Sequence, residues 1–241
     1  MINKAIKTVT ILFFITMLTA CNAEMFNAVN GNRNVITKER RVNEKFTAIK
    51  VSAGIEVYLS QESKTIISLE ADENLHDLII TSVEDGILKI YSEKSIWSAK
   101  AKKVFVAMPE LDNVKATSGS AVFTESTLKT EQISIYATSG AEIQMDLDAH
   151  SIITKSTSGA SIKISGATIR HNAKATSGAS INAYKLKSDS VSAKATSGAS
   201  INIYANNKIE ASATSGGDID FKGNPTDVSK STNSGGSISK K

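Results

Sequence analysis

The acidic residues offer the clearest options for acid–base chemistry in this chain. Asp146 and Asp148 are spaced by two residues, and so are Asp218 and Asp220. Residues two apart share one face of a β-strand, so each pair could present two carboxylates together, as glycan-cleaving enzymes do. The pairs lie about four repeats apart, roughly 19 Å at the usual strand spacing, which is too far to cooperate. We interpret all four as solvent-facing residues that keep their strands soluble.

Other reactive side chains are few or wrongly placed. One Cys excludes a disulfide framework and a multi-cysteine metal site, and three His leave little room for a histidine-based metal or catalytic centre, so we expect no metal and no cofactor. His171 stands where other repeats have Val191 or Ile209, which predicts a structural histidine, either buried or at the end of a rung. Serine is abundant, with 32 residues, but no Gly-x-Ser-x-Gly elbow is present. The sequence therefore predicts no catalytic residue.

Two tyrosines are candidates for binding rather than catalysis. Tyr184 and Tyr204 occupy the same position of adjacent repeats and are predicted to point outward. Two such rings could stack on a sugar, which makes them the candidate ligand face. The alternative is a cross-strand aromatic pair that covers the sheet surface.

The elements that would position these residues come from an internal repeat. Thr-Ser-Gly recurs every 18–21 residues, with a seventh, degenerate copy that begins with Asn, and this period is typical of a solenoid. We predict that its serines form an internal or corner ladder of hydroxyl groups bonded to each other and to the backbone. The glycine that follows is expected to adopt a positive φ. The serines are Ser118, Ser139, Ser158, Ser177, Ser197, Ser215 and Ser234.

Apolar and polar residues alternate on both sides of each serine, as in Ile181 and Ile201, four residues after it. This period of two predicts strands with one buried face. We therefore predict an all-β protein, a right-handed parallel β-helix of ~19-residue rungs, since parallel crossovers are nearly always right-handed. Residues 46–115 are β-rich but less regular, with an Asp85-Gly86 hairpin turn. Ser52–Ile55 resembles an earlier copy of the repeat.

The N-terminus has the features of a lipoprotein signal. Two lysines precede an apolar run, and Leu18-Thr19-Ala20-Cys21 resembles a bacterial lipobox, in which Cys21 is lipidated. We predict a signal peptide at 1–20, a tether at 21–45, a β-rich N-terminal part or cap at 46–115 and the repeat β-helix at 116–241. Removal of 1–20 lowers the net charge from +4 to +2. So small a positive charge gives no reason to expect nucleic acid binding.

Three segments give the chain a family resemblance: 46–57, 70–75 and 83–90, followed by the Thr-Ser-Gly rungs. Together they resemble the head GIN domain family, over roughly residues 40–237. The resemblance implies a β-helix-like fold and an adhesin-type protein of the kind found among Bacteroidetes envelope lipoproteins. It supplies no catalytic or binding residues.

The sequence therefore predicts a non-enzymatic, lipid-anchored envelope protein that acts as an adhesin or binding scaffold. Its expected partners are the membrane, through the lipid anchor, and a glycan or cell-surface protein. Asn22 after the cysteine favours the outer membrane over inner-membrane retention. Two alternatives remain: a polysaccharide-active enzyme of the pectate-lyase-like β-helix type, and a purely structural envelope protein.

Overall fold

The computed structural model describes residues 28–241, and Cys21 and the predicted signal peptide lie outside this range. A single short 3-10 helix, Glu73–Leu75, interrupts the strands within it. No helix in this range is long and apolar enough to cross a membrane. The strands are β1 (Val29–Asn30), β2 (Val35–Arg40), β3 (Ala48–Val51), β4 (Glu56–Gln61), β5 (Ile66–Asp72), β6 (Ile79–Glu84), β7 (Ile87–Ser92), β8 (Ile96–Ser98), β9 (Lys102–Met108), β10 (Asn113–Ala116), β11 (Ala121–Thr124), β12 (Leu128–Ala137), β13 (Glu142–Ser156), β14 (Ser161–Thr176), β15 (Ser180–Thr196), β16 (Ser200–Thr214), β17 (Asp218–Lys222), β18 (Asp227–Asn233) and β19 (Ser237–Lys240).

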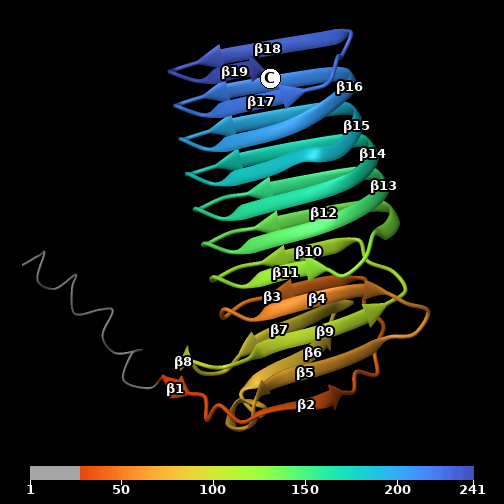
Figure 1. The fold of residues 1–241 in the computed structure, drawn as a ribbon, viewed down its shortest axis with the longest axis vertical. Helices are drawn as coiled ribbons and strands as arrows, with labels where there is room; N and C mark the ends of the chain where they lie inside the picture. The colour runs from red at the N-terminus through yellow and green to blue at the C-terminus, as the bar shows by residue number, and fades with distance from the viewer. Residues whose placement is uncertain (1–27) are drawn as a thin grey trace, which may run out of the picture.

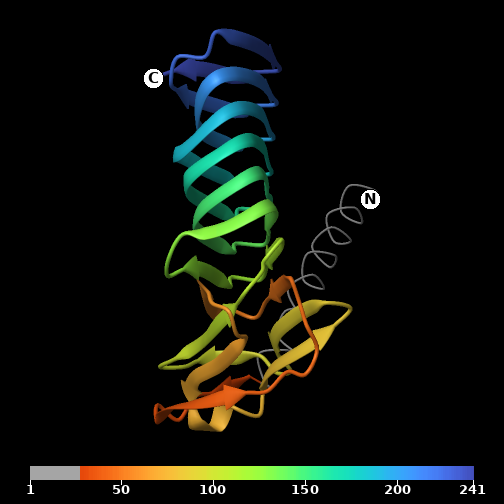
Figure 2. The ribbon, with the colours of Figure 1, turned by 90° about the vertical axis from the view of Figure 1, so that its right-hand side faces the viewer.

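Most strands stack as the rungs of a parallel β-helix (Figure 1). Each rung turns sharply at its Thr-Ser-Gly corner and bends gently on the opposite side, where β13 to β16 run around the bend without a break (Figure 2). Neighbouring strands pair in parallel, residue for residue, through most of β12 to β16. The predicted all-β parallel β-helix is confirmed.

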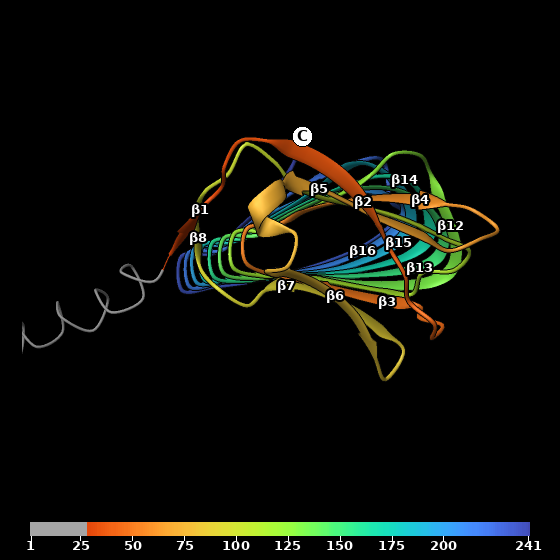
Figure 3. The same ribbon diagram turned by 90° about the horizontal axis from the view of Figure 1, so that it is seen from below.

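The core lies between the two strand segments of each rung, and the rungs form a flattened stack when seen along its length (Figure 3). The inward residues of one segment form a column that includes Ile162, Ile181 and Ile201, all fully buried and paired rung to rung. Small residues such as Ala175 and Ala195 line the facing segment. Alanine brings the two segments close together, which explains why few aromatic residues enter this core.

The first rungs do not follow chain order. β3 lies between β7 and β10, while β4 lies between β9 and β11, so residues 62–112 form rungs beneath the strands that precede them. The backbone N–H of Gly54 donates to the carbonyl of Ser118 at 3.0 Å, which joins the Ser52–Ile55 copy to the column of corners. β6 and β7 form the predicted hairpin, with Asp85 and Gly86 at positive φ.

The structure corrects the predicted tether at 21–45 within the part that it describes, residues 28–45. β2 pairs antiparallel with β5, and β1 pairs with β8, so residues 29–40 cover the base of the stack (Figure 1). The buried carboxylate of Asp72 accepts hydrogen bonds from the backbone N–H groups of Arg33, Lys100 and Ala101. An exposed edge invites pairing with other chains, and β2 covers the edge of β5 with alternating charges.

At the opposite end of the stack, a lysine covers the last aromatic side chain of the core. Phe221 fills the end of the core and is 2% exposed. Lys230 pairs with Ala211 of the rung below, and its Nζ lies 4.7 Å from the centre of the Phe221 ring. A charge at an inward position of the last rung discourages end-to-end association.

Candidate functional site

The corner serines are exposed residues of tight turns. All seven have φ between 48° and 56°, and the glycine after each also has a positive φ, as a type I′ turn requires. The column is held together by its backbone, since the N–H of Gly140 donates to the carbonyl of Ser158 at 3.2 Å and the pattern repeats at the other corners. The predicted ladder of hydroxyl groups is wrong in its bonding. The serine hydroxyls contact the threonine hydroxyl of their own turn at 3.4–3.5 Å in five copies, and no bond joins one corner hydroxyl to the next within residues 28–241.

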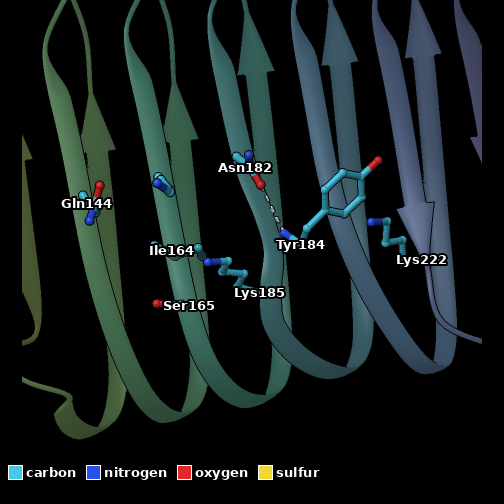
Figure 4. Close-up of a pocket in the computed structure, with 8 residues that line it drawn as sticks. Gln144, Ile164, Ser165, Asn182, Tyr184, Lys185 and Lys222 are labelled. Carbon is cyan, nitrogen blue, oxygen red and sulfur yellow. Dashed lines mark hydrogen bonds between the residues drawn. The ribbon is translucent and has the colours of Figure 1, made fainter. Parts of the chain in front are cut away.

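Tyr184 lies at the one marked break in the β14–β15 register. Pairing is regular through Lys163 and resumes with Ser165 opposite Lys185, so β15 holds one extra residue at this point. Such a bulge bends the strand and redirects its side chains. Here it opens a surface groove of about 410 Å³, along which the Tyr184 ring lies (Figure 4).

The groove around Tyr184 combines an aromatic surface with cations and amides. Lys163, Lys185 and Lys222 line it, together with Gln144 and Asn182. The Nζ of Lys222 lies 4.5 Å from the centre of the Tyr184 ring. Burial raises the pKa of the Tyr184 hydroxyl, and the nearby carboxylates of Asp220 and Asp218 raise it further, so this hydroxyl stays protonated and can donate a hydrogen bond.

Tyr204 points outward on the next rung, but it does not stack on Tyr184. The Nζ of Lys187 lies 3.6 Å from the centre of the Tyr204 ring, so each tyrosine ring contacts a lysine. The aromatic pair considered as the alternative is not found among the described residues.

The candidate carboxylates do not come together. Asp146 and Asp148 lie on β13 at the bend, whereas Asp218 and Asp220 lie on β17, four strands away. Asp220 is paired with Lys241 at 3.2 Å. Residues 28–241 hold no group of three His, Cys, Asp or Glu side chains arranged to bind a metal ion.

His171 is buried in the core, 2% exposed, in a column between Ile152 and Val191. One ring nitrogen, Nε2, lies 2.9 Å from the Thr154 hydroxyl, and Nδ1 has no partner. Burial lowers the pKa of the imidazole to about 4. His171 is therefore neutral at physiological pH and has no access to a substrate.

One outward cluster was not predicted from the sequence. The rings of Phe105, Tyr58 and Phe123 stack on three consecutive rungs, with centroids 5.2 and 5.4 Å apart. Tyr58 lies on β4 and Phe105 on β9, in the part of the chain predicted to be β-rich, and the alternation of each strand places both rings outward. Their meeting depends on the order of the first rungs, because Tyr58 and Phe123 are 65 residues apart in the chain.

Comparisons with known proteins agree on the architecture. Residues 45–225 match the family described as "Putative auto-transporter adhesin, head GIN domain". A search of curated proteins finds no match. Among solved structures, an adhesin-named protein from Bacteroides fragilis is 22% identical, with a TM-score of 0.83 over 89% of this chain and 100% of the other. A protein from Parabacteroides distasonis, titled as lipid binding, is 21% identical, with a TM-score of 0.72 over 89% and 99%. An adhesin-named protein from Parabacteroides merdae is also 21% identical, with a TM-score of 0.68 over the same shares.

Proposed function

This chain belongs to the family described as "Putative auto-transporter adhesin, head GIN domain", and from that premise we propose that it is a non-enzymatic binding protein of the cell envelope. The names of its relatives support a binding role, with two adhesins and one lipid-binding protein among the similar structures. The described residues support it as well, because their candidate carboxylates are dispersed and both of their buried imidazoles, those of His76 and His171, are only 2% exposed.

The groove at the β15 bulge is the proposed glycan site. A rigid stack of rungs fixes the Tyr184 ring at the surface, beside amide and ammonium groups that can bond sugar hydroxyls. A sugar would stack on the ring and displace the Lys222 ammonium from it. Tyr204, on the next rung, extends the same face. The single observation that carries this assignment is the bulge, which opens the groove beside Tyr184.

The test is a glycan array probed with the full-length chain in mild detergent. We expect binding to one class of glycan, and Tyr184→Ala should weaken it at least tenfold. Tyr91→Ala is the matched control, since Tyr91 is a half-buried tyrosine on β7 near the base, and this variant should bind normally. Binding that survives Tyr184→Ala would place the glycan elsewhere. Cleavage of any glycan in the panel would contradict the non-enzymatic assignment.

The proposal includes a lipid anchor at Cys21 in the outer membrane. It is supported by the lipobox sequence at residues 18–21 and by Asn22 after it. Several acyl chains give a stable anchor, so the wild-type chain should partition into the detergent phase and fractionate with the outer membrane. Cys21→Ser should move it to the aqueous phase. Unchanged partitioning of this variant would refute the anchor.

A further inference from the structure

The face of the stack opposite the Tyr184 groove carries a straight row of lysines. Cross-strand pairing aligns one outward position from β7 to β15, and lysine occupies it in six of seven rungs. We call this set the lysine row. Its members, in spatial order, are Lys89, Lys50, Lys115, Lys155, Lys174 and Lys194, with Tyr136 between Lys115 and Lys155.

The lysine row is positively charged along nearly its whole length. Lys89 is paired with Glu84, but the other five lysines have no ion pair within residues 28–241. The adjacent outward column contains Asn113, Ser134, Ile153, Asn172 and Ser192, and reaches a carboxylate only at Glu210 of β16. On the other side, the corner threonines present a parallel row of hydroxyl groups.

This arrangement opposes stability, because like charges directly opposite on neighbouring strands repel each other. A solvent-facing position in a stack could hold Ser or Thr, as the neighbouring columns do. Lysine nonetheless occurs three residues before the serine in four of the first five Thr-Ser-Gly copies. The recurrence of a repulsive residue at one outward column points to a bound polyanion that offsets the repulsion.

The interruption at Tyr136 adds a contact suited to a sugar. A groove of about 460 Å³ lies there, lined by Lys115, Tyr136 and Lys155 among others. The Nζ of Lys115 lies 5.1 Å from the centre of the Tyr136 ring. An aromatic ring between two cations can stack on one sugar while the ammonium groups bind the acidic groups of its neighbours.

We infer that the lysine row binds a linear acidic polysaccharide lying along the axis of the stack. The row follows a straight line with one residue per ~4.8 Å, or roughly 29 Å over six rung steps, and six of its seven residues are lysines. That interval is close to the length of one sugar ring in an extended chain. A nucleic acid fits less well, because single strands are bound largely by stacking on several aromatic side chains and this row offers one. This inference rests on the proposed binding function and names a second site and a ligand class for it.

The test measures binding of the full-length chain in detergent to polygalacturonate and dextran sulfate, with neutral dextran and a single-stranded oligonucleotide as competitors. The test variant is Lys155/Lys174/Lys194→Gln. The control variant, Lys64/Lys94/Lys129→Gln, removes three exposed lysines from outside the row and changes the net charge equally. The same lysines changed to arginine should retain binding, because the charges remain in line.

We expect the test variant to bind the acidic polysaccharides at least tenfold more weakly, while the control binds normally. By analogy with single-stranded polyanions, the slope of log K against log salt should fall by about 2 when three contacts are lost. Equal losses of binding in the test and control variants would overturn the assignment of the lysine row as the binding site. The absence of binding of either polysaccharide by the wild type would do the same. Tighter binding of the oligonucleotide would overturn the ligand class. Neutral-glycan binding that depends on Tyr184 would sustain the proposed function in each of these cases.

Discussion

Replacing the buried His171 by valine, together with its partner Thr154, should remove a large part of the acid sensitivity of this protein. His171 lies between Ile152 and Val191 in the core, and its imidazole bonds only the Thr154 hydroxyl. The double variant Thr154→Val, His171→Val replaces both polar side chains by valine, the residue that the next rung has at the position of His171. It leaves neither group without a partner, which a single substitution would do.

The size of the effect follows from the pKa values. Burial lowers the pKa of His171 from 6.5 to about 4, so the unfolded chain binds the proton more readily than the folded one. A lowered folded-state pKa means that stability is fully present above pH 6.5 and is lost as the pH falls toward 4. The difference of 2.5 pKa units corresponds to about 3.4 kcal/mol at 1.36 kcal/mol per unit.

The assay is urea unfolding at pH 7.5, 6.5, 5.5, 4.5 and 4.0, followed by circular dichroism. Between pH 6.5 and 4 the free energy of unfolding of the wild type should fall by about 3 kcal/mol more than that of the double variant. All other titrating groups are common to both chains, so their contributions cancel in this difference. His150→Gln is the control, since His150 is exposed and its replacement leaves the core unchanged. A flat difference for the double variant would refute the reasoning and mean that water reaches His171.

Four further perturbations test other parts of the structure. Asp72→Asn should cost about 3 kcal/mol by urea unfolding, because a carboxylate bonded to three backbone N–H groups is lost; those bonds outweigh burial and lower the Asp72 pKa, so its contribution should fade only below about pH 4. Ile181→Asp buries an unpaired charge in the core and should cost several kcal/mol; normal melting would mean that the residue is not inward. Lys230→Ile should expose an apolar end above Phe221 and produce end-to-end dimers in sedimentation; a monomer would contradict the capping role. Deletion of Lys185 should restore regular register between β14 and β15, keep the fold and abolish glycan binding, and loss of folding would show that the bulge is structurally required.

The inward columns could be predicted because they obey a strict rule. Each buried position lies directly above an equivalent one, so Ile181 and Ile201 must share size and polarity, and the repeat is visible in the sequence. His171 was recognised by the same reasoning as a structural exception within an apolar column, and of its two predicted positions the structure shows the buried one. The corner serines were located by their repetition, but their hydroxyl bonding was not, because the turn conformation directs them to solvent.

The base of the stack was less predictable because its order in space differs from its order in the chain. β3 and β4 pair with β10 and β11 across an intervening segment that folds beneath them, and no local pattern in the sequence reports that insertion. The strand β2 was missed for a related reason. Its alternation of charges is typical of a solvated linker, and it becomes a strand only because β5 offers an unpaired edge.

Two grooves of this surface follow from the lengths of the rungs. Inward columns tolerate no shift in register, so a rung with extra residues must place them where the strand can leave the stack. The 21-residue spacing between Gly119 and Gly140 does so between β11 and β12, beside a groove of about 300 Å³. The 20-residue spacing between Gly178 and Gly198 does so at the bulge beside Tyr184. Irregular rung lengths therefore create concave sites on the strand segments that follow the corner, whereas the segments that precede the corner keep their register and carry the straight lysine row.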